Sequence, residues 1–341
     1  MKVSSNLRRW LKVNMFPLMV LWDIVIRGAF WAEVSSVYMG IRRHQRDNEL
    51  GRGEYFVRRH IHMLEKGLSM RPRRDTFAEG YIRDLVRRSG MAIVSGALDS
   101  ETERWVRDVL DAYFDATAAS PSTILASARE MYEQYRIPGS TEERLAPRPV
   151  GGVEAGGDLP TLAQLVSLTS ARESVRWFEQ TPVDREVVNA AVRVALESPS
   201  ACNRLPYRFY VLDSPEGAQQ VANLVGGTAG YLSNIQSLIA VVGDLSAYAH
   251  SRDRHLIYVD SGLSVMSLLL GFQAQGVSTC CINWPDLREP DRKISKLLGL
   301  TSSQRTVMLV AYGYADPEGL VPSSGKRLVA SNMSYAGLGN Q

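Results

Sequence analysis

Short runs of apolar residues alternate with polar stretches along the chain, and their spacing predicts the secondary structure. Between residues 54 and 136 apolar side chains recur every three or four positions, as at Val57, Ile61 and Leu64, which indicates several amphipathic helices. After residue 160 the pattern changes to short apolar runs rich in β-branched and aromatic residues. These runs predict strands at 207–212, 237–243, 278–284 and 306–314.

Two longer segments between these runs predict helices. Residues 184–197 carry one apolar face and end before Pro199, which cannot continue a helix. Residues 259–275 contain no charge after Asp260 and are apolar all round, so we expect a helix buried on every side, at the centre of a domain or of a dimer. The fold class is therefore α+β, with a mainly antiparallel or mixed sheet around a buried helix.

Composition divides the chain into regions. Residues 137–160 hold five glycines and four prolines without an apolar period, which is typical of a linker. We expect a helical region at 1–136, an α+β domain at 161–331 and a tail at 332–341. Residues 13–30 are apolar, but Asp23 and Arg27 interrupt them and the charge-free part is too short to span a bilayer. We favour a helix docked on the protein over a peripheral membrane anchor.

Charge and cysteine content narrow the function classes. The net charge is +3, and residues 1–75 hold 15 Lys/Arg against 7 Asp/Glu. We interpret this excess as solvated helix faces, with membrane-surface contact through residues 1–50 as the less favoured alternative, and we expect no nucleic-acid partner. The three cysteines form no CxxC pair, which favours a reduced, cytoplasmic protein. His60 and His62 point to different helix faces, so we expect no metal site.

One segment suggests an anion-binding site. Arg172, Ser174 and Arg176 alternate with other residues, and guanidinium groups bind phosphate oxygens with paired hydrogen bonds. Ser170 and Glu173 fit a capping box, which places these side chains at the start of a helix. Taken alone, a capped helix with exposed arginines explains the same pattern.

Two further segments end in small and polar groups. Pro199, Ser200 and Asn203 follow a helix and allow close approach of a ligand, although an Asx-type turn explains them too. The strand at 278–284 ends in residues 281–283, whose backbone N–H groups are available to a ligand. Lys326 and Arg327 follow the last strand beside serines and a glycine, which fits a phosphate or a basic surface turn.

Together, in this order, the segments resemble the nitroreductase-like family of FMN-dependent oxidoreductases. The resemblance covers roughly residues 162–330 and rests on the RxSxRxF pattern at 172–178, PSxxN at 199–203, the apolar helix and the terminal Arg327. It implies a non-covalent FMN, often at a homodimer interface lined by both protomers. The implied contacts are Arg172, Ser174, Arg176 and Arg327 at the phosphate and pyrimidine side, Pro199, Ser200 and Asn203 beside the ring or ribityl chain, and the backbone of Cys281, Ile282 and Asn283 near the ring.

The resemblance also implies an activity. NAD(P)H reduces the flavin, a second small molecule such as a nitroaromatic, a quinone or a biosynthetic intermediate is then reduced, and no catalytic side chain is required. The alternatives are a flavin-dependent dehydrogenase and a non-catalytic FMN-binding or docking subunit of a biosynthetic complex. Leu205 departs from the glutamine common in the family. Residues 60–77 resemble a helical extension of a subgroup that often accompanies surface-polysaccharide genes.

Overall fold

The computed structural model describes residues 24–25, 30–136, 145–148 and 159–336, and it confirms the α+β class. One four-stranded sheet has the order β1-β2-β4-β3, and every pairing is antiparallel. All four predicted strands are present, with limits within about two residues of those expected. They are β1 (Tyr207–Leu212), β2 (Ser237–Asp244), β3 (Ser278–Asn283) and β4 (Gln304–Gly313).

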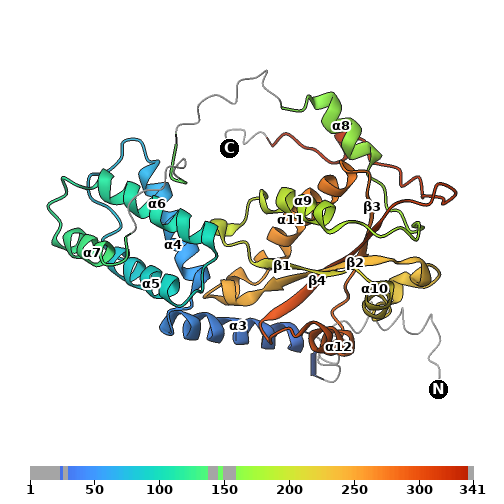
Figure 1. Ribbon diagram of the computed structural model, residues 1–341, viewed down its shortest axis with the longest axis horizontal. Helices are drawn as coiled ribbons and strands as arrows, with labels where there is room; N and C mark the ends of the chain where they lie inside the picture. The colour runs from blue at the N-terminus through green and yellow to red at the C-terminus, as the bar shows by residue number, and fades with distance from the viewer. Residues whose placement is uncertain (1–23, 26–29, 137–144, 149–158, 337–341) are drawn as a thin grey trace.

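Helices cover both faces of the sheet (Figure 1). Alternate residues of a strand point to opposite faces, so Ile239 and Val241 of β2 pack under α9 (Arg185–Leu196) and α11 (Leu256–Gln273). Leu238 and Ala240 face the other way, towards α10 (Pro215–Ala222) and α12 (Arg288–Leu298). The central strand β2 is buried along its whole length because both layers are present.

Helix α11 is only partly enclosed within a single chain, and the expected burial of its remaining side at the centre of a dimer stays a prediction. Its inner face packs on the sheet and α9, whereas Val259, Leu263 and Met266 are 53%, 46% and 42% exposed. These positions are four and three residues apart and therefore form one row on the helix. Residues 251–273 are long and apolar enough to span a membrane, but half of the apolar window is buried inside the protein, as in a core helix.

The N-terminal helices form a second packed unit. The helices α4 (Glu54–Leu68), α5 (Ile82–Val94), α6 (Ser100–Ala116) and α7 (Thr123–Glu133) share a core that includes Ile61, Leu85 and Tyr113. This confirms the helices predicted between residues 54 and 136. Helix α3 (Trp31–Glu49) instead packs on Leu245 and Tyr248 beyond β2. Most of the expected helix at 13–30 and of the expected linker lies outside the described residues.

The segment before the first motif corrects one local prediction. Helix α8 spans Leu162–Ala171, and its capping box is formed by Thr161 and Gln164. Ser170 and Glu173 therefore do not begin a helix. Ser170 lies in the last turn of α8, and Glu173 follows Arg172, the residue that ends the helix.

Candidate functional site

Residues 172–178 extend the sheet beside its edge strand β3. Ser174 bridges to Thr279 of β3, and the Val175 N–H donates to the Thr279 carbonyl at 3.0 Å. In extended backbone alternate side chains share a face, and Val175 is buried in the core. Next to the bridge, Ser174 and Arg176 consequently lie on the other face, where both are partly exposed, whereas Arg172 precedes the bridge at the end of α8. The alternation seen in the sequence is thus that of a strand-like segment, not of a helix start.

A first cavity, of about 320 Å³, opens beside this segment. Its lining includes Arg176 together with three predicted site residues of β3, namely Cys281, Ile282 and Asn283. The Arg176 guanidinium lies 5.8 Å from the ring centroid of Tyr231. Among the nine lining residues Arg176 is the one with a charged side chain. The structure therefore brings four of the sequence-predicted residues to one cavity.

Two features make this first cavity suitable for a planar ligand. Gly226 and Gly227 lie in its wall, and a Cβ on either would meet no atom within 4 Å, so the space beside their backbone is open. β3 is the edge strand of the sheet, and the bridge from Ser174 covers it at Thr279, before Cys281. An uncovered strand edge offers backbone N–H and C=O groups to a ligand.

The second motif, residues 199–205, forms a tight turn rather than a simple helix end. After α9 a 3₁₀ turn, η2 (Ala201–Asn203), leads into β1. Cys202, Asn203 and Leu205 have φ of 54°, 50° and 49°, in the left-handed region that costs a residue with a side chain of order 1 kcal/mol or more. Ser200 Oγ accepts from the Leu205 N–H at 2.9 Å. Such a run of left-handed residues persists only where surrounding contacts hold it.

Helix α11 supplies one of these contacts. Asp260 is 3% exposed, and its Oδ2 accepts from the Ala201 N–H and from the Tyr248 hydroxyl, each at 3.1 Å. Loss of water around Asp260 raises the pKa of its carboxyl, and the two hydrogen bonds and the Arg204 guanidinium partly oppose this rise. Arg204 itself donates to the Ala201 carbonyl at 3.1 Å. The turn is therefore tied to α11 through a buried carboxyl.

The turn lines a second cavity, of about 410 Å³, between the sheet region and the N-terminal helices. Asn203 and Leu205 form one wall, and Arg58 and Trp105 from α4 and α6 lie in the other. Of the predicted site residues, four line the first cavity and Asn203 lines the second, whereas Arg172, Ser174, Pro199 and Ser200 line neither. Arg327 is exposed in the chain that follows β4 and lines neither of them.

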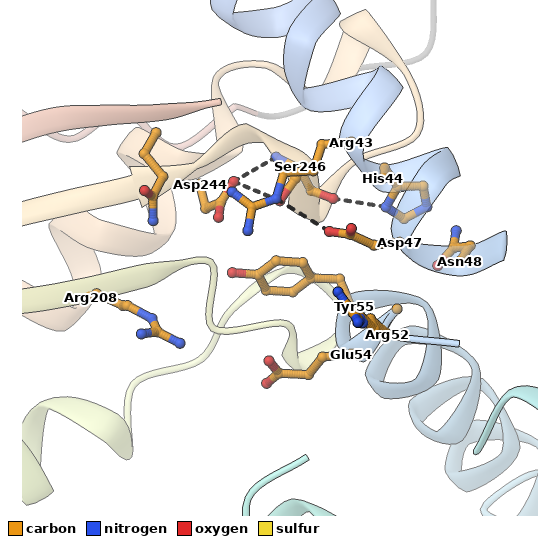
Figure 2. Close-up of a pocket in the computed structure, with 12 residues that line it drawn as sticks. Arg43, His44, Asp47, Asn48, Arg52, Glu54, Tyr55, Arg208, Asp244 and Ser246 are labelled. Atoms are coloured by element: carbon orange, nitrogen blue, oxygen red, sulfur yellow. Dashed lines mark hydrogen bonds and ion pairs between the residues drawn. The ribbon is translucent and has the colours of Figure 1, made fainter. Parts of the chain in front are cut away.

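A third cavity, of about 190 Å³, lies where α3 and the start of α4 meet the end of β2 (Figure 2). Asp244 Oδ1 accepts from the Ser246 N–H and hydroxyl and from the Ser303 hydroxyl, at 2.7–3.0 Å. His44 Nδ1 donates to the Ser246 carbonyl at 2.8 Å, and burial lowers the pKa of His44. These groups largely satisfy one another, so we interpret this cavity as part of a joint between the α3–α4 segment and the sheet region.

Sequence reasoning missed the residues that complete these sites. Tyr231 and the Gly226-Gly227 pair are more than 40 residues away from Arg176 along the chain, and no spacing rule connects them. Arg58 stands next to Val57 in α4, beside the apolar positions of the helix. A charged residue next to an apolar face is the signal that would have marked it, because burial of arginine requires partners.

Comparison with known proteins finds similarity in the second half of the chain. The model of the "Nitroreductase family" matches residues 169–231 and 227–314, which include the segment 172–178, the turn and β1–β4. A curated protein from Bacillus subtilis (strain 168), "Putative NAD(P)H nitroreductase YdgI", is 25% identical over 191 residues. The match covers 45% of this chain and 90% of that protein.

Solved structures also resemble this region. An FMN-dependent nitroreductase from Clostridium difficile R20291 is 19% identical, with a TM-score of 0.41, covering 52% of this chain and 99% of that chain. A nitroreductase family protein from Streptococcus pneumoniae TIGR4 is 22% identical, with a TM-score of 0.43, covering 50% and 99%. The N-terminal helices α3–α7 lie outside the residues matched by the family model.

Proposed function

We propose, from the membership of residues 169–314 in the nitroreductase family, that the protein is an oxidoreductase that binds FMN and uses NAD(P)H to reduce a small acceptor molecule. One observation of the structure carries the proposal most directly. Arg176 lies in the same open cavity as the edge-strand residues Cys281, Ile282 and Asn283. A guanidinium, an uncovered strand edge and glycine-bordered space together suit an anionic, planar cofactor.

The residues present fit FMN by their chemistry. Arg172, Ser174 and Arg176 offer two guanidinium groups and a hydroxyl within five residues, which suits a phosphate or the polar edge of the flavin. The β3 backbone at Cys281–Asn283 offers hydrogen-bonding groups to a heteroaromatic ring. Bound FMN would supply the redox chemistry, taking a hydride from NAD(P)H and passing electrons to the acceptor. The Arg176 guanidinium would hold an anionic part of the cofactor electrostatically.

The turn at 199–205 enters this proposal through a second protomer. Pro199, Ser200 and Asn203 line no part of the first cavity. However, the hydroxyl of Ser198, just before Pro199, donates to the Ser267 hydroxyl of α11 at 2.7 Å, beside the exposed row of that helix. A homodimer that buries this apolar row would also bring the turn of one protomer to its partner. We propose that Ser200 and Asn203 contact the flavin of the partner in this way, with Arg327 at the phosphate.

The purified protein tests the proposal. We expect a yellow protein with the absorbance of oxidised flavin, whose colour bleaches on addition of NADH or NADPH without oxygen and returns on addition of a nitroaromatic or a quinone. A colourless protein that added FMN does not reconstitute would contradict the cofactor. Bound FMN that NAD(P)H does not bleach would instead support the non-catalytic or docking function, or a dehydrogenase that takes hydride from another substrate.

A further inference from the structure

The turn at 199–205 is also held from outside the nitroreductase-family region. Arg58 of α4 is 7% exposed, and its Nε donates to the Asn203 carbonyl at 2.8 Å. Among the described residues of the N-terminal helices, Arg58 is the one whose side chain is hydrogen bonded to this turn. Arg58 therefore binds the backbone of Asn203 itself, a residue in the left-handed region whose backbone conformation sets the direction of its side-chain amide.

Arg58 is itself fixed within the helical unit. Its Nη1 donates to Thr102 Oγ1 at 2.8 Å, and its guanidinium carbon lies 5.3 Å from the Trp105 ring centroid. Thr102 in turn donates to Asp99, the N-cap of α6, at 3.0 Å. A planar guanidinium with two hydrogen bonds and an aromatic face has little freedom to move. The positions of α4 and α6 therefore determine where the Arg58 guanidinium binds the Asn203 carbonyl.

The Asn203 side chain is left available for a ligand. Its own backbone is used, since the N–H donates to the Ser200 carbonyl at 3.0 Å and the carbonyl accepts from Arg58. Among the described residues no partner of its side-chain amide is found. Rotation of the backbone out of the left-handed region would re-aim this amide, and the Arg58 bond opposes that rotation.

We propose that Arg58 is a positioning residue of the flavin site: through the Asn203 carbonyl it holds the turn that presents Ser200 and Asn203, and so couples the N-terminal helices to cofactor binding. The inference rests on the proposed function for its cofactor. The other half of the inference, that Arg58 keeps residues 200–205 rigid, does not depend on FMN binding. Leu205, in the same turn, has no polar side chain to contribute, and Arg58 provides a fixed polar contact from another element.

Four variants of the full-length protein test this. Arg58→Met removes the bond, and Arg58→Lys retains a donor without the planar fork. Thr102→Val disturbs the Arg58 cluster but leaves the bond to Asn203, and Arg59→Met removes the same charge from an exposed neighbour on α4. The readouts are FMN affinity, the visible spectrum of bound FMN, and hydrogen exchange of the 200–205 amides without FMN.

We expect Arg58→Met to weaken FMN binding about 10- to 100-fold, the effect of losing a hydrogen bond to a charged group. It should also shift the flavin spectrum and speed exchange at 200–205. Arg58→Lys should lie between it and the wild type, and carries the test if Arg58→Met does not fold. Thr102→Val loses the bond to Arg58 Nη1 but keeps the Nε bond to Asn203, so it should weaken FMN binding less than Arg58→Met does. Arg59→Met should stay within about threefold of the wild type, well below the effect of a lost charged hydrogen bond.

Two results would overturn the inference. Equal effects of Thr102→Val and Arg58→Met would show that Arg58 merely stabilises the helical unit. Unchanged exchange at 200–205 in folded Arg58→Met or Arg58→Lys would show that it does not hold the turn. A wild-type protein that binds no FMN would contradict the proposed function, whereas the exchange comparison would still decide whether Arg58 holds the turn.

Discussion

Arg176 is the residue on which the first cavity most depends. Arg176 is the one charged side chain in the lining, so it is the one guanidinium of that lining that can bind an anionic ligand. We expect Arg176→Met to weaken FMN binding about 10- to 100-fold, in line with the loss of a charge-assisted hydrogen bond. Fluorescence titration of the apoprotein with FMN measures this.

The matched control for Arg176 is Arg185→Met. Arg185 is an exposed guanidinium on α9 that pairs with Asp213 at 2.8 Å. Exposed pairs contribute little to stability, so this variant should bind FMN as the wild type does. Arg176→Met with wild-type affinity would remove Arg176 from the site.

Asp260 should make stability depend on pH in a defined direction. Its pKa is raised mainly by burial, so the folded protein holds the proton more tightly than the unfolded chain does. Folding therefore loses stability as the pH rises from the unfolded pKa, about 4, through the folded value. Asp260→Asn does not titrate and keeps an acceptor oxygen for Ala201 and Tyr248. The free energy of unfolding of the variant, relative to wild type, should therefore be higher at pH 7 than at pH 4.

Urea denaturation at pH 4 and pH 7 measures this difference for Asp260→Asn and wild type. Other titrating groups are common to both proteins, so their contributions cancel in the comparison. A variant whose stability relative to wild type is the same at both pH values would show that the Asp260 carboxyl has the same pKa in the folded and unfolded chains.

Single residues were predictable where a local pattern determined them. The alternation of Arg172, Ser174 and Arg176 predicted an anion-binding site, which stays a prediction, and the structure places Arg176 of these three in the first cavity. The same segment was wrongly given a helix start, since Ser170 and Glu173 match a capping box that Thr161 and Gln164 form instead. The contact between Arg58 and the turn was not predictable, because Asn203 lies 145 residues away along the chain.

The types of the elements were predictable from their apolar runs, but the sides on which they are exposed were not. The limits of strands β1–β4 were predicted to within about two residues, because runs of β-branched residues between turn residues strongly favour strands. Helix α11 was found as a helix, but its exposed row was not, because an all-apolar sequence does not distinguish burial in its own domain from burial by a partner. A substitution in the exposed row of α11 can therefore show whether a partner protomer buries it.

Leu263→Glu tests whether α11 forms a dimer interface. Leu263 is the middle residue of the exposed row, and a carboxylate buried between two protomers would be strongly unfavourable without a partner. We expect the variant to sediment as a monomer and to bind FMN more weakly than wild type. Analytical ultracentrifugation with FMN titration measures both effects.

The control for the α11 experiment is Val94→Glu, at the end of α5. Val94 is 85% exposed and lies in the N-terminal helical unit, away from α11. It should leave sedimentation and FMN affinity unchanged. A dimeric Leu263→Glu protein, or a monomeric wild type with full FMN affinity, would contradict an interface at this row.

At the scale of the whole molecule, packing does not follow the order of the chain. Helices α4–α7 have their own core, whereas α3, which precedes them, joins the cluster around Leu245 and Tyr248. Gly40 allows this close contact, since a Cβ there would lie 2.7 Å from the Leu245 carbonyl carbon. Sequence alone suggested a single helical region at 1–136, and those domain limits stay a prediction. The apolar spacing within α3 does not show which distant segment the helix packs against.

Val37→Ala and Val34→Ala test how much α3 stabilises the molecule. Both residues lie on α3 and gain the same helix propensity on becoming alanine, but Val37 is 4% exposed and Val34 is 43% exposed. We expect Val37→Ala to lower the free energy of unfolding by about 1–3 kcal/mol, through lost burial and the cavity left behind. Val34→Ala should change it by less than about 0.5 kcal/mol.

Urea denaturation followed by tryptophan fluorescence gives both values for the α3 pair. Equal effects of Val37→Ala and Val34→Ala would mean that α3 does not dock on the sheet region in solution. A loss confined to Val37→Ala would instead show that the chain before α4 stabilises the sheet region directly.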